Sequence, residues 1–143
     1  MAVAISQTAN PAGVAAVSTV ATYTGASIGT ATTDRIVVVV VGTELASSTP
    51  SACTIDGSSM TAATAGNFGA VFTQVFYKFW PTGTTAEFKI TFSSVTPSEV
   101  QNHIAVYKVT GASDTLGGSG GDGTPDPQDD LVTTGSTTIP TDG

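Results

Sequence analysis

A run of β-branched residues, with a charged pair at one end and glycine at the other, dominates the sequence: Asp34-Arg35-Ile36-Val37-Val38-Val39-Val40-Val41-Gly42. Such side chains are restricted at χ1 and pack well on a pleated surface. The run is too short for a membrane span, which needs about 20 apolar residues. A buried helix is the rival interpretation, but five consecutive valines are poor helix formers and leave no polar stripe. The run therefore predicts the central strand of a sheet, with both of its faces buried.

Composition favours an all-β domain. The chain has 143 residues, enough for one domain with its own core. Charged residues make up only 10%, while threonine, serine, glycine and alanine are abundant, which is typical of strands joined by many turns. Eleven acidic against four basic residues give a net charge of −7, so a nucleic-acid partner is not expected, because phosphate binding needs a basic face.

Period-two alternation recurs along the chain and predicts further strands. In residues 70–80, Val71, Val75 and Tyr77 face one way and Phe72, Phe76 and Trp80 the other. Residues 87–92 alternate apolar and polar side chains. Asp56-Gly57 lies between extended residues and predicts a tight hairpin, because both positions tolerate positive φ. The expected strands cover residues 3–6, 17–24, 34–42, 53–55, 59–61, 70–80, 87–92 and 99–110.

Eight or nine short strands without helical periodicity predict an antiparallel β-sandwich, jelly-roll-like in topology. We assign residues 1–112 to this sandwich core. Residues 113–130 form an acidic glycine-rich loop, and residues 131–143 are a C-terminal strand or tail. The single cysteine excludes an internal disulfide framework, and no segment is expected to act as a signal peptide or a membrane span.

Two catalytic or nucleotide-binding patterns occur in the acidic loop. Residues 117–121 match G-x-S-x-G and residues 118–123 match G-x-G-x-x-G. Both patterns work only between a strand and a helix, whereas Thr124-Pro125-Asp126-Pro127 follows here. We interpret both as chance matches in a glycine-rich segment.

The usual nucleophiles and bases are scarce. His103 is the only histidine, and its place near the start of a strand predicts an outward-facing side chain without a positioned partner. Cys53 lies among small residues, with no basic cluster to stabilise a thiolate, so a buried inert thiol is expected. The sequence therefore predicts no catalytic residues and no enzyme activity.

The acidic loop holds the only plausible metal ligands. Carboxylates on a flexible loop suit calcium, but the spacing does not match an EF-hand and prolines interrupt it. A solvated loop is the default interpretation, and no cofactor is predicted. The weak calcium candidates are Asp122, Asp126, Asp129 and Asp130.

Aromatic residues near the ends of two strands are candidates for a partner or ligand surface. Tyr77, Trp80 and Tyr107 either form a platform for a sugar or a neighbouring chain, or simply pack in the core. The sequence alone leaves both alternatives open.

Three segments carry a family resemblance. They are residues 23–41, which open with Tyr-Thr-Gly-Ala-Ser-Ile-Gly and end in the valine run, Thr54-Ile-Asp-Gly, and residues 104–112, Ile-Ala-Val-Tyr-Lys-Val-Thr-Gly-Ala. Together they resemble a group of small β-sandwich proteins of tailed bacteriophages, over roughly residues 17–112. Members of that group are virion components, found as capsid decoration proteins or as modules of tails and fibres. The resemblance implies no catalytic residues.

The resemblance and the composition lead to one functional expectation. The chain is expected to be a non-enzymatic virion structural protein, made in the host cytoplasm, most simply a capsid decoration (cement) subunit. Its expected partners are the major capsid protein or tail proteins and further copies of itself, with neither nucleic acid nor membrane involved. A tail, baseplate or fibre component is the first alternative. A carbohydrate-binding module or adhesin is the second.

Overall fold

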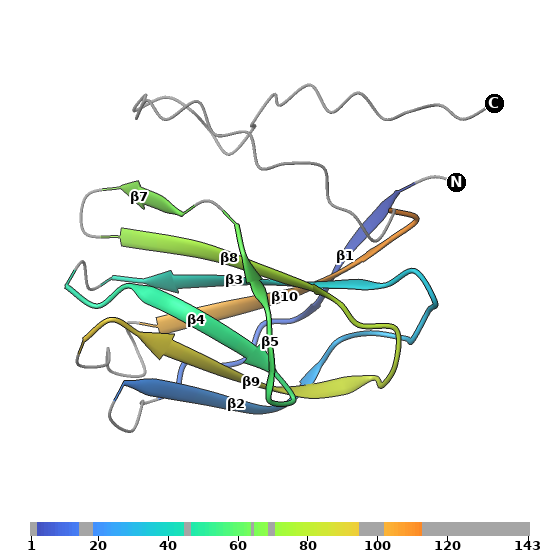
Figure 1. Ribbon diagram of the computed structural model, residues 1–143, viewed down its shortest axis with the longest axis horizontal. Coiled ribbons are helices and arrows are strands. Elements are labelled where there is room, and N and C mark those ends of the chain that lie inside the picture. Colours follow the sequence, from blue (N-terminus) through green and yellow to red (C-terminus); the bar gives the residue numbers. More distant parts are fainter. Residues whose placement is uncertain are drawn as a thin grey trace.

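The computed structural model describes residues 3–14, 19–44, 47–63, 65–68, 71–94 and 102–112, and these residues form two antiparallel β-sheets packed face to face (Figure 1). The β-sandwich predicted from the sequence is confirmed. The expected acidic loop (113–130), the four calcium candidates within it and the C-terminal segment (131–143) lie outside the described residues. No helix in the described part is long and apolar enough to cross a membrane.

Sheet A is built around the valine run. Its strand order is β1-β10-β3-β8-β6, and β7 also pairs with β8. The strands are β1 (Ala4–Ala9), β3 (Ile36–Thr43), β6 (Thr61–Ala62), β7 (Gly66–Phe68), β8 (Val71–Phe79) and β10 (Asn102–Thr110). The valine run therefore occupies the central strand, as predicted, with its backbone groups paired on both sides.

Sheet B is smaller, with the order β2-β9-β4-β5. Its strands are β2 (Val20–Ser27), β4 (Pro50–Ile55), β5 (Ser58–Ser59) and β9 (Thr85–Phe92). Asp56 and Gly57 join β4 to β5 with φ values of 45° and 77°, which confirms the predicted Asp-Gly hairpin. The strand orders establish the sandwich but do not establish the jelly-roll topology that the strand number suggested.

The core lies between the inner faces of the two sheets. On β3, Val37, Val39 and Val41 are fully buried, whereas Val38 and Val40 on the opposite face are only half-buried. The expectation that both faces of the run are buried is therefore wrong for Val38 and Val40, although Ile36 on the same outer face is buried. Sheet A is an outer layer of a two-layer sandwich, so a central strand within it has only one face against the core.

Sheet B supplies the other half of the core through strict alternation. On β9, Phe88, Ile90 and Phe92 are buried against sheet A, as their spacing predicted. Ile28, in the connection after β2, is also fully buried, and its N–H donates to Thr84 O at 2.9 Å. The period of two in the sequence thus translates directly into one buried and one outward face.

Candidate interaction surface

The outer face of sheet A is defined by the side chains of β1, β3, β8 and β10 that point away from sheet B. Three rows of directly opposed residues cross it. The rows are Ile5, Val109, Ile36 and Phe79; then Gln7, Tyr107, Val38 and Tyr77; then Ala105, Val40 and Val75. These three rows contain no aspartate, glutamate, lysine or arginine and are largely apolar, and a fourth row of His103, Gly42 and Thr73 continues the face.

Several large apolar side chains on this face remain open to solvent. Ile5 is 69% exposed, Val71 45% and Phe79 41%, whereas Ile36 and Val109, between Ile5 and Phe79 in the same row, are buried. A monomeric protein rarely leaves a broad apolar patch uncovered, and such a patch commonly marks an interaction site. The outer face of sheet A therefore has the chemistry of a contact surface.

The outer face of sheet B has the opposite character. Thr22, Lys89 and Thr54 lie side by side across β2, β9 and β4. The Lys89 Nζ atom lies 3.1 Å from Glu87 Oε1 in an exposed ion pair, which contributes little to stability but keeps this face hydrated. The two outer faces thus differ sharply in polarity, and only that of sheet A is suited to burial.

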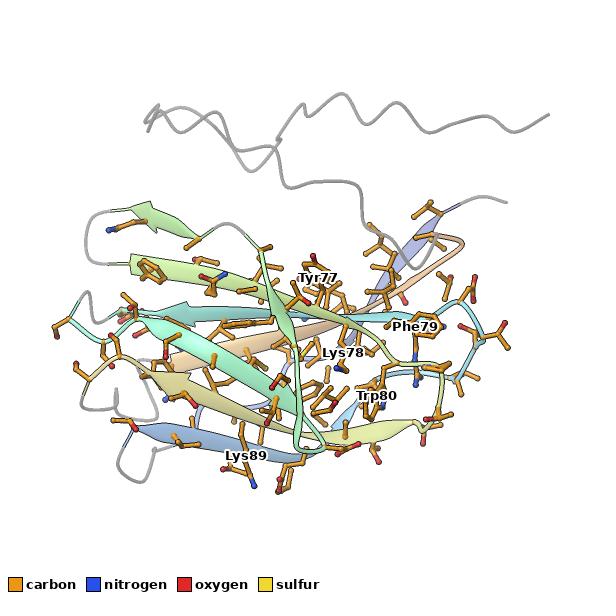
Figure 2. All side chains as sticks on the ribbon, in the orientation of Figure 1. Tyr77, Lys78, Phe79, Trp80 and Lys89 are labelled. Carbon is orange, nitrogen blue, oxygen red and sulfur yellow. The ribbon has the colours of Figure 1, made fainter. Side chains whose placement is uncertain are left out.

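The structure separates the three aromatic candidates. Tyr77 and Tyr107 are both directly opposite Val38, so they share one row on the outer face, about 10 Å apart across two strand spacings. Trp80 lies on the other side of β8 (Figure 2) and packs against the core. Trp80 is therefore excluded from a common platform with the tyrosines, because it lies three positions after Tyr77 and successive side chains of an extended chain alternate between the two faces.

The candidate base and the candidate nucleophile lie in different layers. His103 is exposed at the start of β10, as predicted, in the same row as Gly42 of β3. Cys53 is buried on the inner face of sheet B, and this burial raises the pKa of its thiol to about 12. A thiol in this position stays protonated, and the two side chains cannot form a catalytic pair.

Sequence reasoning missed the role of Arg35, which is fully buried at the start of β3. Its Nε donates to Trp80 O at 2.7 Å and its Nη1 to Gly29 O at 2.8 Å, and further bonds reach Ile28 O and Thr82 O. These partners are main-chain carbonyl oxygens, so the guanidinium joins two connections rather than presenting a charge to a ligand. Only its position directly before the valine run hinted that it is buried.

A second buried polar group joins the two sheets. The Tyr23 hydroxyl of β2 donates to Asn102 Oδ1 of β10, and Asn102 Nδ2 donates to Val14 O at 2.8 Å. Burial raises the pKa of Tyr23 to about 12. This network is structural, because both side chains are buried away from the outer faces.

The described residues contain no group of three or more histidine, cysteine, aspartate or glutamate side chains placed to hold a metal ion. Comparison of the chain with protein families, with curated proteins and with solved structures found no match. The candidate site therefore rests on the geometry of sheet A itself.

Proposed function

We propose that the protein is a non-enzymatic structural component of a bacteriophage virion, a capsid decoration (cement) subunit that binds through the outer face of sheet A. The observation that carries this proposal is the contrast between the two outer faces, one largely apolar, the other polar with an ion pair. A cement subunit has to bury surface against its neighbours, and an apolar face does so at little desolvation cost.

The tertiary structure supports an assembly role in a second way. Val38, Val40 and Val75 lie on strands that are paired on both sides, so the surface they form is rigid before any partner binds. A rigid surface loses little conformational entropy on binding.

The direct test uses purified particles of the phage that encodes the chain. Mass spectrometry of separated heads and tails should find the chain in heads, and electron cryomicroscopy should place its density on the outer capsid surface. Detection in tails alone would favour the tail, baseplate or fibre alternative. Absence from both fractions would reject a virion role.

A pair of matched variants tests the surface. Val40→Lys places a charge at the centre of the outer face of sheet A, and Thr22→Lys places the same charge on the outer face of sheet B. Co-sedimentation with capsids lacking the protein should show at least about a tenfold loss of affinity for Val40→Lys, because an unpaired charge is buried in the contact. Thr22→Lys should bind like the wild type. Equal binding by the two variants would show that a different surface is used.

The row of Tyr107, Val38 and Tyr77 favours one alternative, a carbohydrate-binding module or adhesin, since two tyrosines on a flat uncharged surface can stack on sugar rings. Titration of the chain with a panel of glycans, followed by tyrosine and tryptophan fluorescence, separates the two functions. A saturable change that is lost in a Tyr77→Ala variant would favour sugar binding, and no change is expected for a capsid subunit.

A further inference from the structure

The two sheets have four edges within the described residues, and they are not equally protected. β5 and β6 are two residues long and β7 is three, so these edges offer little backbone to a partner. β2 is interrupted by an irregularity between Tyr23 and Ala26, where Gly25 has a φ of 66°. β1 is longer than β5, β6 and β7, and its residues 4–7 pair with β10 without interruption. Its six residues contain neither a charged residue nor a proline that would block pairing.

β1 also lacks packing on both of its faces. Each residue from Ala4 to Gln7 is exposed, and Val3 and Ile5 are 51% and 69% exposed. Successive side chains of a strand point to opposite faces, so exposure of four in a row means that neither face is covered. Figure 1 shows this end of β1 at the periphery of the molecule.

The strand is anchored at its other end only. β1 pairs with β10 through its backbone, and Thr8 Oγ1 lies 2.9 Å from Ser27 O, which it bonds across to β2. The pairing with β10 is irregular at Thr8 itself, between Gln7 and Ala9. Folding of a single copy therefore gains almost no apolar burial from residues 3–7, although these residues hold two branched apolar side chains.

We propose that β1 is a strand-addition site at which a second copy of this chain pairs antiparallel, β1 with β1, about a twofold axis at Ile5. Unpaired backbone groups on an edge strand are complementary to those of another edge strand. This pairing makes a second copy of the chain one partner in the proposed assembly. Its biological role rests on the proposed function.

Charge favours a second copy as the occupant. In a twofold interface, residues near the axis lie close to the same residues of the second copy. An acidic contact surface, which the net charge of −7 makes common on this chain, would therefore be repelled by its own copy. Residues 3–9 carry no charge, so β1 avoids this repulsion. With Ile5 on the axis, Val3 lies opposite Gln7 of the second copy, and the outer faces of the two copies of sheet A join into one continuous apolar surface.

The size of the contact predicts a weak interaction. An edge of six residues buries much less than the roughly 1,600 Å² of a standard protein interface. Self-association in dilute solution should therefore depend on concentration, and it becomes strong only where many copies are held close together, as on a capsid.

An engineered cysteine tests the register. Directly opposed residues of antiparallel strands have Cα atoms about 4.5–5.5 Å apart, which is within disulfide range. Full-length Ile5→Cys should form a disulfide-linked dimer under mild oxidation. The native Cys53 is buried and gives no background. Thr22→Cys, exposed on sheet B, is the control for random collision and should cross-link at least about tenfold more slowly.

Sedimentation equilibrium over a roughly hundredfold range of concentration provides the second measurement. The wild type should shift from monomer towards dimer, and Ile5→Lys should stay monomeric with an unchanged melting temperature, because Ile5 is already exposed. A wild type that stays monomeric, together with equal cross-linking of the two cysteine variants, would overturn β1 pairing. Capsid binding by the same wild-type sample would show that the proposed function survives that failure.

Discussion

Two reciprocal hydrogen bonds join Arg35 and Trp80: Trp80 N donates to Arg35 O at 2.9 Å, and Arg35 Nε donates to Trp80 O at 2.7 Å. These bonds tie the residue before β3 to the residue after β8. The buried Arg35 side chain therefore links this end of the β3–β8 pair, in addition to the backbone hydrogen bonds between the two strands. The same bonds bring the guanidinium next to the carbonyl groups of both adjoining connections.

Replacing Arg35 with methionine should destabilise the fold by about 3 kcal/mol, because it leaves several buried carbonyl oxygens without their charged donor. Chemical denaturation measures this change in the free energy of unfolding. Lys89→Met on the exposed face of sheet B is the control and should change it by less than about 0.5 kcal/mol. Equal stability of the two variants would show that the carbonyl cluster does not depend on Arg35.

The one-sided burial of β3 predicts a contrast between neighbouring valines. Val39→Ala removes two methyl groups from the core and should cost about 2–3 kcal/mol. Val40→Ala, on the half-buried outer face, should cost less than about 1 kcal/mol in the isolated chain. Thermal or urea unfolding of the two variants compares the faces directly. Similar losses would mean that the outer face of sheet A is packed as tightly as the core.

Alanine substitutions at three glycines distinguish two causes of lost stability: backbone strain at positive φ and steric crowding of the added Cβ atom. Gly29 has a φ of 73°, and an added Cβ would lie 3.0 Å from Thr8 Cγ2 and 3.3 Å from Lys108 Cδ. Gly29→Ala should therefore cost more than the roughly 1–2 kcal/mol of left-handed strain alone. Gly25→Ala, at 66° with open space, should cost about that strain, and Gly42→Ala, without positive φ, should stay within about 0.5 kcal/mol. Urea unfolding of the three variants gives the order, and a Gly42→Ala loss as large as that of Gly29→Ala would contradict it.

The pKa of Tyr23, raised from 10.0 to about 12 by burial, predicts alkaline destabilisation. Between these pH values the folded chain keeps a proton that the unfolded chain has lost, so the free energy of unfolding falls as pH rises. Burial of Cys53 adds a similar decline that begins near pH 9.0. Tyr23→Phe should be about 1–2 kcal/mol less stable at pH 7, because Asn102 loses its donor.

The same Tyr23→Phe variant should show a shallower decline between pH 10 and pH 12 than the wild type, since its phenylalanine does not titrate. Urea unfolding at a series of pH values provides both measurements, and Tyr77→Phe on the outer face of sheet A serves as the control. Parallel pH profiles for the wild type and Tyr23→Phe would rule out Tyr23 as a source of the alkaline decline.

Side-chain alternation was enough to predict most of the strands and the inward face of β9, because a strand against a core leaves a period of two in its sequence. The expected strand at 59–61 is split between β5 and β6, and the short strand β7 was missed, since three residues in a small-residue segment carry no period. Likewise, nothing in the sequence distinguished the buried face of the valine run from the outer one, because both faces carry the same residue type.

For the candidate surface, the sequence supplied the residue types and the tertiary structure decided their grouping. That Tyr77 and Trp80 point to opposite faces of β8 follows from their spacing alone. That Tyr77 and Tyr107 share a row with Val38 depends on β8 and β10 pairing on either side of β3. Strand order and register arise from long-range backbone pairing, which leaves no local trace in the sequence. The sequence by itself therefore determined an all-β chain with few charged residues, and only the packing of its two sheets decided which face, largely apolar and without charged rows, is turned outward.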